Sequence, residues 1–188
     1  MKTFKLIFGL FLIIGLHSCS NDDDNPPPVN EEEVITTMTI TLTPQGGGTA
    51  ITMRTQDLDG DGPNAPVVTV SGALATNTVY NGSIELLNEL ENPAEDITEE
   101  VEEEDDEHQF FFSLTGTNAT TMYADMDGDG NPVGLAFTLT TTDAGANSIT
   151  VTLRHEPAKD AAGVSDGDIT NAGGETDIEE TFNFVVGV

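Results

Sequence analysis

Basic residues are scarce in this sequence. Five Lys and Arg stand against 34 Asp and Glu in 188 residues, which gives a formal net charge of −29. A chain with this charge repels nucleic acid and anionic lipid surfaces, so we exclude both as binding partners. Cys19 is the single cysteine, so the chain forms no internal disulfide. Tryptophan is absent as well, and without a Cys pair and a Trp the hallmarks of antibody-type domains are missing.

Recognisable catalytic motifs are also missing. The sequence has no G-x-S-x-G, no phosphate-binding G-x-x-x-x-G-K and no H-E-x-x-H. No pair among its many carboxylates stands out as the acid and base of a hydrolase. We therefore expect a protein that is not an enzyme.

The first 18 residues are predicted to be a signal peptide. Lys2 and Lys5 flank the start of an apolar run, residues 6–16, and LHSC follows at residues 16–19. The run is too short to cross a bilayer, which needs roughly 20 apolar residues. The segment resembles bacterial lipoprotein signals, and this resemblance implies that Cys19 becomes the first mature residue and carries the lipid anchor.

A polar tether is predicted for residues 19–33. Its SNDDDNPPPVNEEE segment contains three consecutive prolines, which favour an extended, semi-rigid chain. The acidic residues 22–24 resemble the export signal of Bacteroidota surface lipoproteins, which implies an outer-membrane location facing the cell exterior. A merely solvated spacer is the alternative. Without the signal peptide, three basic residues remain against 34 acidic ones, a net charge of −31, and solvent cations are needed to screen this repulsion.

Residues 34–188 are predicted to form one all-β domain. Short segments with period-two alternation are separated by Gly, Asn, Asp and Pro clusters. In one of them Ile149, Val151 and Leu153 fall on one face, which would pack while the other face meets water. The spacing predicts a single antiparallel two-sheet sandwich of Ig-like architecture. The predicted strands are residues 35–42, 49–55, 66–72, 77–89, 108–116, 133–141, 147–154 and 180–188.

One short acidic helix is predicted between the strands. Asn92 is a suitable N-cap, and Pro93 suits the first helical position. The acids at 102–107 oppose the helix dipole, so we expect the helix to fray there. An apolar stripe at helical spacing would lie against the sandwich; it consists of Leu90, Ala94, Ile97 and Val101.

Two acidic loops, DLDGDG and DMDGDG, repeat one pattern. Alternate carboxylates can converge on one ion because the glycines let the chain curl tightly. The pattern matches the first half of an EF-hand, but the twelfth position holds Val68 in one copy and Ala136 in the other, so neither loop is an EF-hand. We expect hairpin tips that either bind Ca²⁺ weakly or are plain turns. The candidate calcium ligands are Asp57, Asp59, Asp61, Asp125, Asp127 and Asp129.

The two histidines of the mature chain are candidates for a different site. His108 opens a predicted strand directly after the acidic run 102–107, and His155 closes another, next to Glu156. If these strand ends meet, the imidazoles, Glu156 and part of the acidic run would form a site suited to Zn²⁺ or a similar ion. The alternative is that each histidine is a structural residue with satisfied hydrogen bonds.

Nearly the whole chain resembles a group of small acidic Bacteroidota lipoproteins. The resemblance rests on the lipobox, the acidic stretch before HQFFF, and the phrases TLRHEPAKDAAGVSDGDITNAGGETDIEETF and DLDGDGPNAPVVTVSG. That group often carries the label of a type 1 periplasmic binding fold, which would imply alternating helices and parallel strands, whereas this sequence predicts a sandwich. The resemblance also implies a TonB-dependent outer-membrane receptor as partner.

The leading hypothesis is a non-catalytic surface lipoprotein, anchored in the outer membrane through Cys19, that binds divalent cations and assists uptake or ligand capture. The main alternative is a structural or adhesive Ig-like module whose acids only confer solubility. A hydrolase of extracellular polymer is the third hypothesis, and it would need a concave acid cluster with one carboxyl in an apolar setting.

Overall fold

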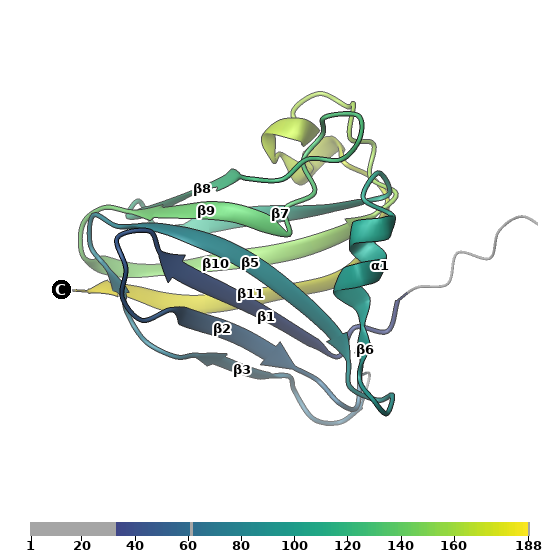
Figure 1. Ribbon diagram of the computed structural model, residues 1–188, viewed down its shortest axis with the longest axis horizontal. Helices are drawn as coiled ribbons and strands as arrows, with labels where there is room; N and C mark the ends of the chain where they lie inside the picture. The colour runs from purple at the N-terminus through teal and green to yellow at the C-terminus, as the bar shows by residue number, and fades with distance from the viewer. Residues whose placement is uncertain (1–32, 61, 188) are drawn as a thin grey trace, which may run out of the picture. The chain divides into compact units, whose positions relative to one another are not determined.

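Period-two alternation builds two β-sheets that face each other. The computed structural model describes residues 33–60 and 62–187, and within them the chain forms eleven strands, one α-helix and two short 3-10 turns (Figure 1). The predicted signal peptide, Cys19, the tether up to residue 32 and Asp61 lie outside the described residues. The prediction of an all-β sandwich is confirmed.

The larger sheet has the order β3-β2-β1-β5-β9-β8, and β6 adds to it by pairing with β5. All of these pairs are antiparallel. β2 pairs with β3, and β8 with β9, so each acidic loop connects two neighbouring antiparallel strands, as predicted. The strands are β1 (Thr37–Pro44), β2 (Ile51–Gln56), β3 (Val67–Val70), β5 (Val79–Asn88), β6 (Glu95–Asp96), β8 (Ala119–Tyr123) and β9 (Ala136–Thr141).

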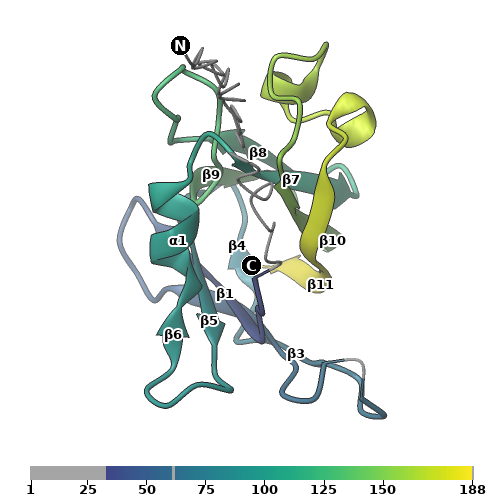
Figure 2. The same ribbon diagram turned by 90° about the vertical axis from the view of Figure 1, so that its right-hand side faces the viewer.

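The smaller sheet has the order β4-β11-β10-β7. β10 pairs antiparallel with both neighbours, while the short β4 pairs parallel with β11. Figure 2 shows this sheet as a layer beside the one that contains β1 and β5. Its strands are β4 (Leu74–Ala75), β7 (His108–Thr115), β10 (Gly145–His155) and β11 (Glu175–Gly187).

The hydrophobic core lies between the two sheets. Ile149, Val151 and Leu153 of β10 are at most 1% exposed, which confirms the face predicted for this strand. Burying each such side chain contributes about 1.5–3 kcal/mol. The other large, fully buried side chains of the core include Met38, Ile40, Leu42, Met53, Leu86, Phe110, Phe137, Leu139 and Phe182.

The helix begins later than the sequence analysis predicts. α1 spans Ile97–Glu103, and its N-cap is Asp96, whose side chain accepts a hydrogen bond from the N–H of Thr98 at 3.0 Å. Asn92 is therefore not the cap, because the chain first pairs with β5 as β6 and starts the helix afterwards. The helix ends early in the acidic run, as the dipole argument predicts. No helix among the described residues has the length and apolar character needed to cross a membrane.

Only part of the predicted apolar stripe contacts the core. Ile97 and Val101 are buried in it, with exposures of 2% and 0%, whereas Leu90 is 58% exposed and lies before β6. Ala94 is exposed as well. The helix therefore covers the end of the sandwich with two apolar side chains and turns its acids outward.

A loop between β10 and β11 covers the outer face of the smaller sheet. It contains the turns η1 (Val164–Asp166) and η2 (Ile169–Asn171). Phe111 of β7 packs against Val164 and Ala172 of this loop. Gln109 of β7 donates a hydrogen bond to the carbonyl of Val164 at 2.9 Å. The first four residues of β7 are therefore buried on both faces of the sheet.

Candidate metal site

β7 begins and β10 ends at the same end of the smaller sheet. Their antiparallel register places His108 opposite His155. The imidazole rings stack with centroids 4.6 Å apart and an angle of 27° between their planes. His108 is 0% exposed and His155 is 5% exposed. The structure thus brings together the two histidines that the sequence analysis singled out.

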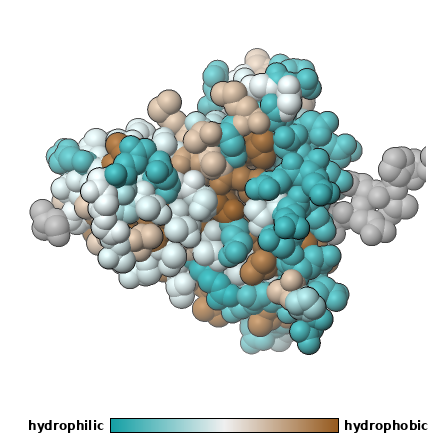
Figure 3. Space-filling model, in the orientation of Figure 1, coloured by the Kyte–Doolittle hydropathy of each residue, from teal (hydrophilic) through white to brown (hydrophobic). Residues whose placement is uncertain are grey.

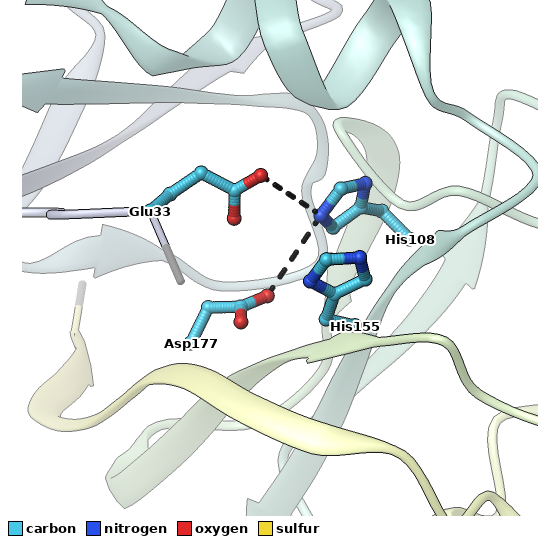
Figure 4. Close-up of side chains that lie close together, drawn as sticks. All are labelled: Glu33, His108, His155 and Asp177. Carbon is cyan, nitrogen blue, oxygen red and sulfur yellow. Dashed lines mark ion pairs between the residues drawn. The ribbon is translucent and has the colours of Figure 1, made fainter. Parts of the chain in front are cut away.

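Two buried carboxylates join the histidines. Glu33, before β1, places Oε1 3.5 Å from Nε2 of His108, and Asp177 of β11 places Oδ2 3.9 Å from the same nitrogen (Figure 4). The side chains of these acids are 9% and 1% exposed. One donor atom from each of the four residues lies within 4.8 Å of the others. We call Glu33, His108, His155 and Asp177 the histidine–carboxylate cluster.

A β-bulge directs Asp177 into the cluster. In the pairing of β10 with β11, Leu153 lies opposite Ile178 but Arg154 lies opposite Thr176, so Asp177 is one extra residue on β11. A bulge bends the strand locally and re-aims a side chain. Here the extra residue supplies a carboxylate that strict alternation along β11 would not predict.

Hydrogen bonds and charges determine which nitrogen of each histidine faces the cluster. Nδ1 of His108 lies 3.1 Å from the carbonyl oxygen of Glu104, and because a carbonyl oxygen only accepts, Nδ1 donates. In the neutral form of this ring the lone pair is at Nε2, the nitrogen that faces both carboxylates. Nε2 of His155 lies 3.6 Å from Oε2 of Glu107. The other nitrogen of His155, Nδ1, is therefore the donor atom available to the cluster. It is buried and has no hydrogen-bond partner.

The contacts of His108 with the two carboxylates are ion pairs longer than hydrogen bonds, and their lengths are compatible with ligands of one ion. Separations of 3.5 and 3.9 Å around Nε2 of His108 exceed the usual N–H···O range of about 2.7–3.2 Å. Two ligands of a tetrahedral ion, each bonded at about 2.0–2.1 Å, lie roughly 3.4 Å apart. Three buried atoms here lack a hydrogen-bond partner: Oε2 of Glu33, Nε2 of His108 and Nδ1 of His155.

The charge of the donor set matches that of a divalent ion. Metal ligands bind deprotonated, and in that form two carboxylates and two imidazoles carry a charge of −2, which a divalent cation would neutralise. A mixed set of imidazole nitrogens and carboxylate oxygens is suited to Zn²⁺ and similar ions, whereas Ca²⁺ and Mg²⁺ prefer oxygen ligands alone.

Glu156, the other predicted ligand, lies beside the cluster and not in it. Glu107, His155 and Glu156 form a second group of converging donors, but both glutamates are exposed. Glu107, from the predicted acidic run, faces Nε2 of His155 and can orient the ring from outside. The acidic run therefore contributes a neighbouring carboxylate and the carbonyl of Glu104, while the buried acids come from Glu33 and Asp177.

Gly174 allows the chain to pass close to this end of β10. Its φ is +67°, and a Cβ on it would lie 2.1 Å from the carbonyl oxygen of His155. A side chain at this position would therefore both strain the backbone and displace a residue of the cluster.

The first acidic loop uses its carboxylates to form a turn. Oδ1 of Asp57 accepts hydrogen bonds from the N–H groups of Asp59 and Gly60 at 3.1 and 3.0 Å. Oδ2 of Asp59 accepts from the side-chain amide of Asn64 at 2.6 Å. These bonds are typical of Asx turns.

The second acidic loop also binds its own backbone, together with a lysine. The two carboxylate oxygens of Asp125 accept from the N–H groups of Gly134 and Ala136, each at 2.7 Å. Oδ1 of Asp127 accepts from the backbone of Asp129 and Asn131, and Oδ2 from Lys159 at 2.9 Å. The ammonium of Lys159 thus lies where a calcium ion was predicted. No group of converging metal donors among the described residues includes an aspartate of either loop.

Acidic residues surround the end of the sandwich that carries the cluster. Figure 3 shows hydrophilic residues gathered on the side where α1 lies. Burial raises the pKa of the Glu100 carboxyl, and the charges of Glu95 and Glu33 raise it further. This concentration of negative charge attracts cations to the region of the cluster.

Comparison of the chain with protein-family models, with curated proteins and with solved structures finds no match.

Proposed function

We propose that this protein is a non-catalytic surface lipoprotein whose sandwich binds one divalent transition-metal ion, Zn²⁺ or an ion of similar preference. The observation that carries the proposal is the histidine–carboxylate cluster, in which two nitrogen and two oxygen donors converge in a buried place. Structural histidines with satisfied hydrogen bonds would not leave Nε2 of His108, which has only ion-pair contacts at 3.5 and 3.9 Å, and Nδ1 of His155 without a hydrogen-bond partner.

The cellular setting of the proposal comes from the sequence. The lipobox before Cys19 and the acidic, proline-rich tether support a lipid anchor in the outer membrane with the sandwich facing the cell exterior. There the protein would hold the ion, or a ligand bound through it, for uptake by a TonB-dependent receptor. The proposal concerns the cluster and not the two acidic loops, because the carboxylates described there bind the backbone and Lys159.

Zinc binding is tested with the mature chain carrying Cys19→Ser, since the thiol would otherwise offer a competing ligand. After chelation, Zn²⁺ at 100 times its dissociation constant is expected to raise the free energy of unfolding by about 2.7 kcal/mol. Mg²⁺ and Ca²⁺ at equal ionic strength are expected to add nothing beyond salt screening. Denaturant unfolding and competition with a chromophoric chelator measure these effects, with one Zn²⁺ per chain as the expected stoichiometry.

A matched pair of variants locates the site. Asp177→Asn removes one anionic ligand and is expected to weaken Zn²⁺ binding by at least about tenfold. Loss of a residue that only orients a metal ligand already lowers metal affinity by about that factor. Asp143→Asn makes the same chemical change at an exposed turn far along the chain and is expected to bind Zn²⁺ like the parent. Equal responses of the parent to all three cations would leave the cluster as a structural ion pair and favour the adhesive module.

A further inference from the structure

We propose that the ion fastens the N-terminal segment, residues 33–35, to the smaller sheet, so that ion occupancy controls the junction between the predicted tether and the sandwich. This inference rests on the proposed ion binding. It concerns how the same site regulates the attachment of the domain.

The four ligands come from two different parts of the fold. His108, His155 and Asp177 lie on β7, β10 and β11, which are adjacent strands of the smaller sheet. Glu33 precedes β1, which belongs to the larger sheet. An ion bound by all four residues therefore connects the smaller sheet to the segment through which the chain enters the larger one (Figure 4).

Few other interactions hold residues 33–35. Val34 is 54% exposed, the hydrogen bond from Ile35 N–H to the carbonyl of Glu33 is local, and the side chain of Ile35 is partly buried against the core. Hydrogen bonds to β5 begin at Thr36, whose N–H donates to the carbonyl of Leu87 at 3.0 Å. Glu33 has the only polar side chain of residues 33–35, so its carboxylate makes the polar attachment of this segment.

Electrostatics makes that attachment depend on the ion. Oε2 of Glu33 has no hydrogen-bond partner, and the carboxylate shares a small buried space with Asp177. With a divalent ion bound, both carboxylates are attracted to the same point. Without the ion, the Glu33 carboxylate keeps its ion-pair contact with His108, but it lies close to the like charge of Asp177 and gains hydration by leaving. The segment therefore has a held state and a released state, and the ion stabilises the held one.

The segment held by Glu33 lies where the predicted tether joins the sandwich. Glu33 is the last residue of the predicted tether that begins at Cys19. Release of residues 33–35 would lengthen the free tether by roughly 10–11 Å, at about 3.3–3.6 Å per extended residue. Ion binding would thus shorten the tether and fix its point of departure from the sandwich.

Amide hydrogen exchange of the mature Cys19→Ser chain, followed by mass spectrometry with and without Zn²⁺, tests the inference. In the parent, saturating Zn²⁺ is expected to slow exchange at Val34 and Ile35 by roughly tenfold or more, because opening of the segment then requires loss of a ligand. Glu33→Gln keeps three ligands, so at saturating Zn²⁺ its residues 153–155 are expected to be protected while Val34 and Ile35 exchange as in the ion-free parent. Glu85→Gln, the same change at an exposed position of β5, is expected to behave like the parent.

Two results would overturn the inference, and only the second would overturn the proposed function as well. If Zn²⁺ binds and protects residues 153–155 but leaves Val34 and Ile35 unchanged in the parent, or protects Val34 and Ile35 equally in Glu33→Gln, the ion site stands and the fastening of the segment is wrong. If Zn²⁺ binds to neither protein, the proposed function and this inference fail together.

Discussion

Lys159 is a buried cation in a strongly acidic protein. Its ammonium lies 2.9 Å from Oδ2 of Asp127, and the two side chains are 5% and 1% exposed. The ammonium also donates to the carbonyl oxygen of Asp105. Water reaches neither charge freely, so each depends on the other. This single lysine connects the second acidic loop, the turn after α1 and the loop between β10 and β11.

Removing either partner of this pair is expected to be costly. Asp127→Asn and Lys159→Met should each lower the free energy of unfolding by about 3–5 kcal/mol, because each leaves a buried partner without its counter-charge. The double variant should lose clearly less than the sum of the single losses. Denaturant unfolding of all four proteins measures the coupling. Additive losses would contradict the account of Lys159 as the partner of Asp127.

The same pair predicts a pH dependence. Burial disfavours the charged carboxylate of Asp127, but hydrogen bonds from Lys159 and from the backbone of Asn131 outweigh burial and hold its pKa below the usual range. A carboxyl whose pKa is lowered in the folded state stabilises the protein above its unfolded-state pKa, and this contribution is lost as the pH falls through the folded-state pKa. The stability difference between the parent and Asp127→Asn should therefore be full at pH 7 and shrink in acid. A constant difference down to the pH of acid unfolding would contradict this assignment.

The site residues differ in how far the sequence could reveal them. His108 and His155 are the two histidines of the mature chain and lie at the ends of alternating segments, so their meeting could be anticipated. The role of Asp177 could not be anticipated, because its position depends on a bulge that alternation does not predict. The role of Glu33 could not be anticipated either, since it is one of three successive glutamates in a segment predicted to be tether. In a sequence with this many acidic residues, the two that are buried in the cluster cannot be distinguished from the others.

Among the elements, α1 shows how pairing competes with a local helix signal. Asn92 and Pro93 form a plausible helix start, but Glu95 and Asp96 pair with β5, and the backbone groups that a longer helix would leave unpaired are used in the sheet. The longer strands were predictable because apolar residues recur at every second position. Alternation did not identify β4 or β6, which have two residues each, and β8 was predicted only as the strand before the second hairpin tip.

The cap of α1 can be tested directly. Asp96→Ala removes the acceptor for Thr98 N–H and is expected to lower the free energy of unfolding by about 0.5–2 kcal/mol. Asp143→Ala, the same change at an exposed turn, should stay within about 0.5 kcal/mol of the parent. Thermal or denaturant unfolding separates the two. Equal effects would show that Asp96 is not the cap that stabilises α1.

At the scale of the whole molecule, the surface charge and the buried histidine–carboxylate cluster have different effects on cations. The acidic surface around α1 raises the local concentration of any cation, but it does not select among cations. In the proposed function, selection would come from the cluster, because imidazole nitrogens are unsuited to Ca²⁺ and Mg²⁺ and suited to Zn²⁺. The fold brings β7, β10, β11 and the segment before β1 together at one end of the sandwich.

Anomalous X-ray diffraction at the zinc edge, from crystals of the mature Cys19→Ser chain grown with Zn²⁺, tests the central claim most directly. We predict one strong anomalous peak at about 2.0–2.2 Å from Nε2 of His108, Nδ1 of His155 and one carboxylate oxygen each of Glu33 and Asp177. Crystals of fully folded protein with no peak at that position would contradict the claim, and so would a Zn²⁺ bound only at the surface acids.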